Sequence, residues 1–147
     1  MYQRILLAYD GSPTGQKALL SFQDLSQWRQ AKLTLLTVVP TLEMATGAVE
    51  MGYMSQPFSA THEDETHQLL DTGVQVLSDL GFHADGVLLK GETIREITRY
   101  AQEQQADLIV VGHKHEKSLL RRWWSGSTAK SLVEESPCNV LIVITPS

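Results

Sequence analysis

The sequence predicts an α/β fold built on an open, five-stranded parallel sheet with helices on both faces. Short apolar runs alternate with longer amphipathic stretches, the pattern of consecutive βαβ units. The apolar runs are nearly continuous, which is typical of strands covered on both faces. The chain has 147 residues, the size of one domain with a substantial core. We therefore expect a single domain over residues 1–147.

The first βα unit is expected over residues 2–28. Tyr2–Tyr9 predicts the first strand, and the turn that follows begins at Asp10. Ser12 can cap a helix whose first residue is Pro13, because proline lacks only an N–H that has no helical partner there. This helix is expected to reach Trp28, since apolar residues recur near a 3.6-residue period at Ala18, Leu19, Phe22, Leu25 and Trp28.

The next unit contains the longest irregular segment. Leu33–Val39 predicts the second strand, and the aperiodic residues 41–60 predict a long loop. A helix is expected from about Ala60 to Leu80, and Gly81 suits its carboxyl end. The side chains expected to face inward are Leu69, Leu70, Val74, Leu77 and Leu80. Phe82–Leu89 predicts the third strand.

The carboxyl-terminal third completes the alternation. Its expected order is a helix, a short strand, a loop, a helix and a final strand. These elements are Gly91–Gln105, Leu108–Val111, His113–Ser125, Gly126–Glu135 and Asn139–Ile144.

Composition argues against several classes of protein. Lys and Arg number 12 against 17 Asp and Glu, and the resulting net charge of −5 argues against a nucleic-acid partner. No apolar run approaches the ~20 residues of a membrane span, so no membrane partner is expected. The single Cys138 excludes an internal disulfide framework. A cytoplasmic location is the expectation.

Asp10 is the first candidate site residue. Parallel sheets of this kind bind ligands at the carboxyl ends of their strands, where the strand order reverses. A carboxylate there can accept hydrogen bonds from a ribose hydroxyl or hold Mg²⁺ beside a phosphate. The alternative is local turn chemistry, because Asp-Gly-Ser-Pro is a natural turn and helix cap.

A second candidate site lies between Gly112, expected to follow the fourth strand, and Gly126-Ser127-Thr128, expected to begin a helix. A helix start offers unpaired N–H groups and a positive dipole end, which favour an anion. Four basic residues and one acidic residue give residues 113–125 a net charge of +3. The basic residues are Lys114, Lys117, Arg121 and Arg122. These features indicate a phosphate site, with a solvated loop as the alternative.

Several segments together resemble the universal stress proteins. They are Ile5–Ser12, Leu35–Pro40, Gly91–Ile94, Asp107–Gly112, Gly126-Ser127 and Ser136–Val143. Their order and spacing match the family over essentially the whole chain. The resemblance implies an adenine nucleotide alpha hydrolase-like fold, a Rossmann-like three-layer sandwich. It also implies a homodimer that pairs through the carboxyl-terminal strand.

The resemblance also implies roles for individual residues. Asp10 would meet the ribose, or Mg²⁺ bound with the nucleotide, and the backbone of Val38 would meet the adenine. The residues implied around the phosphates are Gly112, Gly126, Ser127 and Thr128; Lys114, by its charge, and His115, by its ring N–H, are further candidates there. His115 stands where ATP-binding members have a second glycine, and the stretch before Gly126 is one residue longer. A side chain there argues against a triphosphate, although it can donate a hydrogen bond to an anion. The candidate ligands are ATP, ADP and AMP.

The sequence contains no convincing catalytic set. No nucleophile-elbow motif is present, and nothing places a serine beside a histidine and a carboxylate. The function that the resemblance implies is a stress-response sensor or regulatory module, in which nucleotide orders residues 113–125 and 41–60 for a regulatory protein partner. Two alternatives are a nucleotide-free dimeric interaction protein, which His115 favours, and a slow ATPase using Asp10 and Mg²⁺.

Overall fold

The computed structural model describes residues 1–41, 60–114 and 127–145. Five strands form one parallel sheet in the order β3-β2-β1-β4-β5. The strands are β1 Arg4–Tyr9, β2 Lys32–Val39, β3 His83–Lys90, β4 Leu108–Lys114 and β5 Asn139–Thr145. The predicted parallel sheet is confirmed. Its order reverses at β1, because the chain first builds outward to β3 and then returns to place β4 on the other side of β1.

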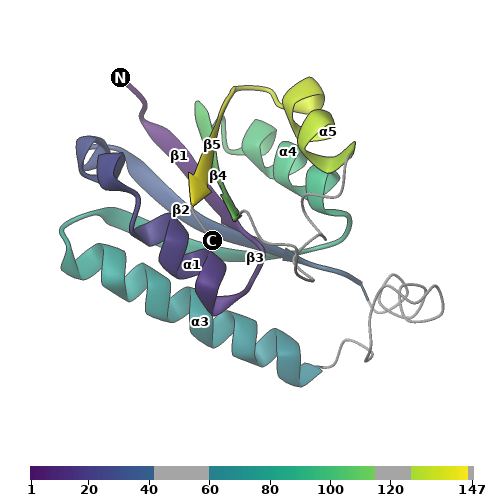
Figure 1. Cartoon of the computed structure of the whole chain (residues 1–147), viewed down its shortest axis with the longest axis horizontal. Helices are drawn as coiled ribbons and strands as arrows, with labels where there is room; N and C mark the ends of the chain where they lie inside the picture. The colour runs from purple at the N-terminus through teal and green to yellow at the C-terminus, as the bar shows by residue number, and fades with distance from the viewer. Residues whose placement is uncertain (42–59, 115–126, 146–147) are drawn as a thin grey trace.

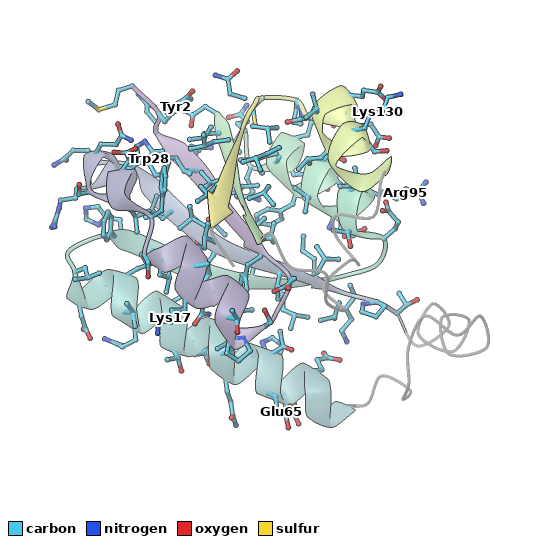
Figure 2. The ribbon with its side chains drawn as sticks, in the orientation of Figure 1. Tyr2, Lys17, Trp28, Glu65, Arg95 and Lys130 are labelled. Carbon is cyan, nitrogen blue, oxygen red and sulfur yellow. The ribbon has the colours of Figure 1, made fainter. Side chains whose placement is uncertain are left out.

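Helices cover both faces of the sheet, as predicted (Figure 1). One layer contains α1, the 3₁₀ helix η1 and α3, and the other contains α4 and α5. Their bounds are α1 Pro13–Leu20, η1 Gln23–Trp28, α3 Ala60–Asp79, α4 Thr93–Glu103 and α5 Ser127–Glu135. Figure 2 shows Lys17 and Glu65 on the first layer, and Arg95 and Lys130 on the second. None of the described helices is long and apolar enough to cross a membrane.

The apolar core is divided by the sheet into two parts. Successive residues of β1 point to opposite faces, so Ile5 and Leu7 pack under α1 and α3 while Leu6 and Ala8 pack under α4 and α5. These four side chains are at most 2% exposed. The near-continuous apolar run of β1 follows from burial on both sides.

The first helix is shorter than predicted. It ends at Leu20, and the N–H and hydroxyl of Ser21 both donate to the Lys17 carbonyl, at 3.0 and 2.7 Å. Phe22 then turns to extended geometry before η1 begins. Leu25 and Trp28 are nevertheless buried in the core, so the apolar pattern identified the correct side chains in the wrong kind of helix.

The inward position predicted for Leu80 is wrong. Its side chain is 49% exposed, whereas Leu70 and Leu77 are buried and Leu69 and Val74 pack against the core. The cause is the helix end. α3 stops at Asp79, and Gly81 adopts a left-handed φ of +90° that turns the chain toward β3.

The boundaries of two later elements also differ from prediction. β4 continues to Lys114, because β5 pairs with it as far as Lys114 opposite Thr145. Gly112 therefore lies inside the strand, opposite Val143, and does not follow it. Helix α4 begins at Thr93 because the Glu92 carboxylate caps it.

Candidate functional site

The site is built where the strand order reverses. Tyr9, the last residue of β1, pairs with Thr37 of β2, and Ala8 pairs with Val111 of β4. Asp10 follows at once and is half-buried between the ends of these neighbouring strands. We call the carboxyl ends of β1, β2 and β4 the carboxyl edge. Open parallel sheets bind their ligands at this position.

The turn after β1 holds the Asp10 carboxylate in place. Asp10 Oδ1 accepts hydrogen bonds from the Ser12 N–H at 3.0 Å and the Ser12 hydroxyl at 2.6 Å. Ser12 Oγ in turn accepts from the Gly15 N–H at 3.0 Å and so caps α1, with Pro13 at the helix start. The predicted cap is confirmed, and the local turn chemistry that was the alternative interpretation of Asp10 is present.

Gly11 and Thr37 join the ends of β1 and β2. The Thr37 hydroxyl is fully buried and donates to the Tyr9 carbonyl at 2.9 Å. Gly11 has a φ of +85°, and a Cβ on it would lie 3.3 Å from Thr37 Oγ1. A residue other than glycine would therefore be strained in its backbone and crowded against Thr37. The turn that carries Asp10 has little freedom to move.

A buried polar network lies beneath this turn. Gln16 is 6% exposed, and its side-chain amide donates to the Leu69 carbonyl of α3 at 2.8 Å and to the Tyr9 hydroxyl at 3.3 Å. Burial raises the pKa of Tyr9 to about 12, although the hydrogen bond from Gln16 lowers it; the charge of Asp10 adds to the increase. Tyr9 is therefore neutral near pH 7. The network joins β1, α1 and α3 immediately behind Asp10.

Val38 lies at the β2 end of the carboxyl edge, and the end of β3 lies next to it. Val38 is buried in β2 opposite Leu89, and the next carbonyl, that of Val39, accepts the Gly91 N–H at 3.0 Å. Lys90 Nζ lies 2.8 Å from Glu63 Oε1 in the first turn of α3. This ion pair connects the end of β3 to the helix that borders the edge.

The structure brings most of the predicted site residues to the end of the sheet where the strands terminate. Asp10, Val38, Gly112 and Lys114 lie at or near the ends of three adjacent strands. Ser127 and Thr128 begin α5, whose other end leads directly into the start of β5. The first turn of α5 therefore lies at the same end of the sheet as the carboxyl edge, and the first N–H groups of a helix have no acceptor within the helix. His115 and Gly126 lie outside the described residues.

Sequence reasoning missed several residues of this region. Gln16 carries a visible signal, because a polar residue interrupts the otherwise apolar face of the first helix, whereas Gly15 carries none. Thr37 likewise interrupts an apolar strand. The Lys90–Glu63 pair has no local signal, because it depends on how α3 packs against β3.

Comparison with known proteins agrees with this architecture. The family model described as the Universal stress protein family matches residues 1–143. Universal stress protein YxiE of Bacillus subtilis is 31% identical, over 97% of this chain and 99% of its own length. A universal stress protein from Archaeoglobus fulgidus, solved in complex with dAMP, superposes with a TM-score of 0.66 at 17% identity, covering 97% of this chain and 98% of that one.

A universal stress protein family member from Arabidopsis thaliana, solved with AMP bound, superposes with a TM-score of 0.61 at 16% identity. The alignment covers 97% of this chain and 91% of that one. These structural likenesses show a shared fold of the Rossmann-like, adenine nucleotide alpha hydrolase type. The match of the family model over nearly the whole sequence shows that the chain belongs to the universal stress protein family.

Proposed function

We propose that this protein binds an adenine nucleotide at the carboxyl edge and acts as a regulatory module. The observation that carries the proposal is the position of Asp10. Its carboxylate is fixed by the Ser12 turn at the point where the strand order reverses. Ligands of this fold class bind at such points, and a carboxylate there suits the hydroxyl groups of a ribose.

Each part of the nucleotide has a matching part of the edge. Asp10 accepts from the ribose, and the backbone at Val38 contacts the adenine. On the other side of Asp10, the start of α5 contributes N–H groups and the positive end of its dipole to the phosphate. The residues assigned to the phosphate are Gly112, Lys114, His115, Gly126, Ser127 and Thr128.

Two family structures support an adenine ligand. The Archaeoglobus protein was solved with dAMP and the Arabidopsis protein with AMP, and both share the fold of this chain. Both ligands combine adenine with a single phosphate. Together with His115 at a position where close phosphate approach favours glycine, this supports AMP as the first ligand to test.

A magnesium ion would reach this site only with the nucleotide. Among the residues that the structure describes, no three His, Cys, Asp or Glu side chains are grouped to hold a metal ion. Asp10 offers one carboxylate, and one of its oxygens already accepts two hydrogen bonds from Ser12. Phosphate oxygens would have to supply most of the remaining ligands.

The regulatory role follows from population shift. Bound nucleotide favours one arrangement of the chain around the carboxyl edge, and a protein partner in the cytoplasm reads that arrangement during stress. We further propose that the protein acts as a homodimer paired through β5. β5 is the outermost strand next to β4, and its residues Val140, Leu141 and Ile142 are only half-buried. Edge strands with apolar side chains are stabilised by pairing.

Isothermal titration calorimetry tests the proposal. AMP, ADP and ATP are titrated into the protein with and without Mg²⁺, and into the Asp10→Ala variant. Wild-type protein is expected to bind at least AMP, and the variant to bind it at least tenfold more weakly, because a charge-assisted hydrogen bond is lost. Absence of binding by wild type at millimolar ligand contradicts the proposal.

A further inference from the structure

Gly15 leaves the space that the Asp10 carboxylate occupies. It lies in the first turn of α1, and a Cβ built on it would be 2.5 Å from Asp10 Oδ1 and 3.0 Å from Ser12 Oγ. Real Cβ atoms essentially never approach a neighbour as closely as the first of these distances. Any side chain at position 15 therefore has to displace the carboxylate of Asp10 from its present place.

Ser12 holds the same carboxylate from the other side. Its N–H and hydroxyl both donate to Asp10 Oδ1, at 3.0 and 2.6 Å, while its oxygen accepts the Gly15 N–H at 3.0 Å. The Gly15 amide thus polarises the Ser12 hydroxyl toward the carboxylate. Two donors restrict Oδ1, and the turn thereby sets the direction in which the second carboxylate oxygen points.

We propose that Gly15 and Ser12 are positioning residues that make this protein selective for ribonucleotides over nucleotides without ribose hydroxyls. The proposal rests on the proposed function, because the ligand must place its ribose at Asp10. A carboxylate held rigidly gains a strong hydrogen bond from a ribose hydroxyl. A nucleotide without ribose hydroxyls offers the carboxylate no hydrogen-bond donor, so it binds more weakly than a ribonucleotide.

A merely structural role for Gly15 predicts a different result. Alanine is the better helix former, and no left-handed φ prevents it here. If Gly15 served only the helix, Gly15→Ala would preserve nucleotide binding and raise the thermal midpoint. If it serves Asp10, the variant folds but loses its preference for the ribose hydroxyls.

The experiment compares AMP with 2′,3′-dideoxy-AMP by calorimetry. Wild-type protein is expected to prefer AMP by about tenfold or more, the value of one charge-assisted hydrogen bond. Gly15→Ala is expected to bring that ratio close to one by weakening AMP alone. Thr14→Ala is the matched control: it makes the neighbouring, exposed helix position alanine and should keep the wild-type ratio.

Ser12 provides a second, independent pair of variants. Ser12→Ala removes the hydroxyl and is expected to reduce the ratio severalfold, whereas Ser12→Thr keeps a hydroxyl and should restore it. The affinity for dideoxy-AMP reports whether the rest of the site is intact. A parallel loss of affinity for both ligands in Gly15→Ala and Ser12→Ala would show a general structural effect and overturn the positioning role.

The outcomes separate this inference from the function on which it rests. If wild type binds neither ligand, the proposed function fails. If wild type prefers AMP and Gly15→Ala keeps the full preference, only the positioning role of Gly15 is overturned. If wild type binds both ligands equally, nucleotide binding stands and ribose selectivity through Asp10 is overturned.

Discussion

Burial determines the chemistry of Tyr9, the residue before the candidate ligand carboxylate. Its side chain is 1% exposed, and burial raises its pKa from 10.0 to about 12. When folding raises the pKa of a group, the group's contribution to stability is complete at pH values below its unfolded-state pKa. That contribution is lost as pH rises through the folded-state pKa. Tyr9 should therefore make stability fall between about pH 10 and 12, by about 1.4 kcal/mol per pH unit.

Urea unfolding at pH 9 and pH 11 measures this effect. Tyr9→Phe removes the titrating group, so its free energy of unfolding should fall less than that of wild type, by about 1 kcal/mol. The comparison cancels the other groups that titrate in this range. Equal pH dependence in the two proteins would contradict the burial of an ionisable hydroxyl at position 9.

Gly73 lies against the core, whereas Gly15 lies against the Asp10 carboxylate, so a side chain at Gly73 should affect stability. A Cβ on Gly73 would lie 2.5 Å from Leu35 Cδ2 and 2.6 Å from Gln16 Nε2. Gly73→Ala should therefore destabilise the fold by about 1–3 kcal/mol in urea unfolding, despite the better helix propensity of alanine. Ser78→Ala on the exposed side of α3 is the control and should change stability little. Stabilisation by Gly73→Ala would disprove this packing.

At the scale of single elements, α4 depends on an unusual cap. The Glu92 carboxylate accepts the N–H groups of Ile94 at 3.1 Å and Arg95 at 2.8 Å. Glu92→Ala should lower the free energy of unfolding by about 1 kcal/mol, the typical loss on removing a cap. Glu92→Gln keeps one acceptor oxygen and should lose less. Equal stability of all three proteins in chemical denaturation would show that solvent replaces the cap without loss.

The elements themselves were largely predictable, and their ends were not. The apolar run of β1 reflects burial on both faces of the sheet, which is typical of a strand in a parallel sheet covered by helices. The end of α1 depends on Ser21, whose hydroxyl competes for a helix carbonyl. The end of β4 depends on pairing with β5. The residues of β4 alone do not show how far β5 pairs with them, so the predicted strand ended at Val111 and not at Lys114.

The same distinction holds for the candidate site. Asp10 could be found because a polar residue directly after a buried strand identifies a carboxyl end. Gly15 and the Lys90–Glu63 pair could not, because their roles depend on neighbours that only the fold supplies. For Gly15, the relevant quantity is a distance to Asp10 across a turn, and composition does not encode it.

At the scale of the whole molecule, the two edge strands offer a matched test of the proposed homodimer. Ile142 of β5 and Val87 of β3 are both half-buried on edge strands. Lysine on an edge strand opposes pairing with another chain. Ile142→Lys should therefore convert the dimer to monomer in sedimentation velocity, whereas Val87→Lys should leave it dimeric. A monomeric wild-type protein, or dimers in both variants, would rule out pairing through β5.

The central claim is that an adenine nucleotide binds at the carboxyl edge beside Asp10. An NMR titration of ¹⁵N-labelled protein with AMP tests it most directly, because each backbone amide reports its own surroundings. We predict shifts concentrated at Gly11 in the turn after β1, Val38 of β2 and Thr128 of α5, which the proposal places around the ligand. Amides that remain unchanged at millimolar AMP, or shifts confined to the opposite ends of the strands, would contradict the account.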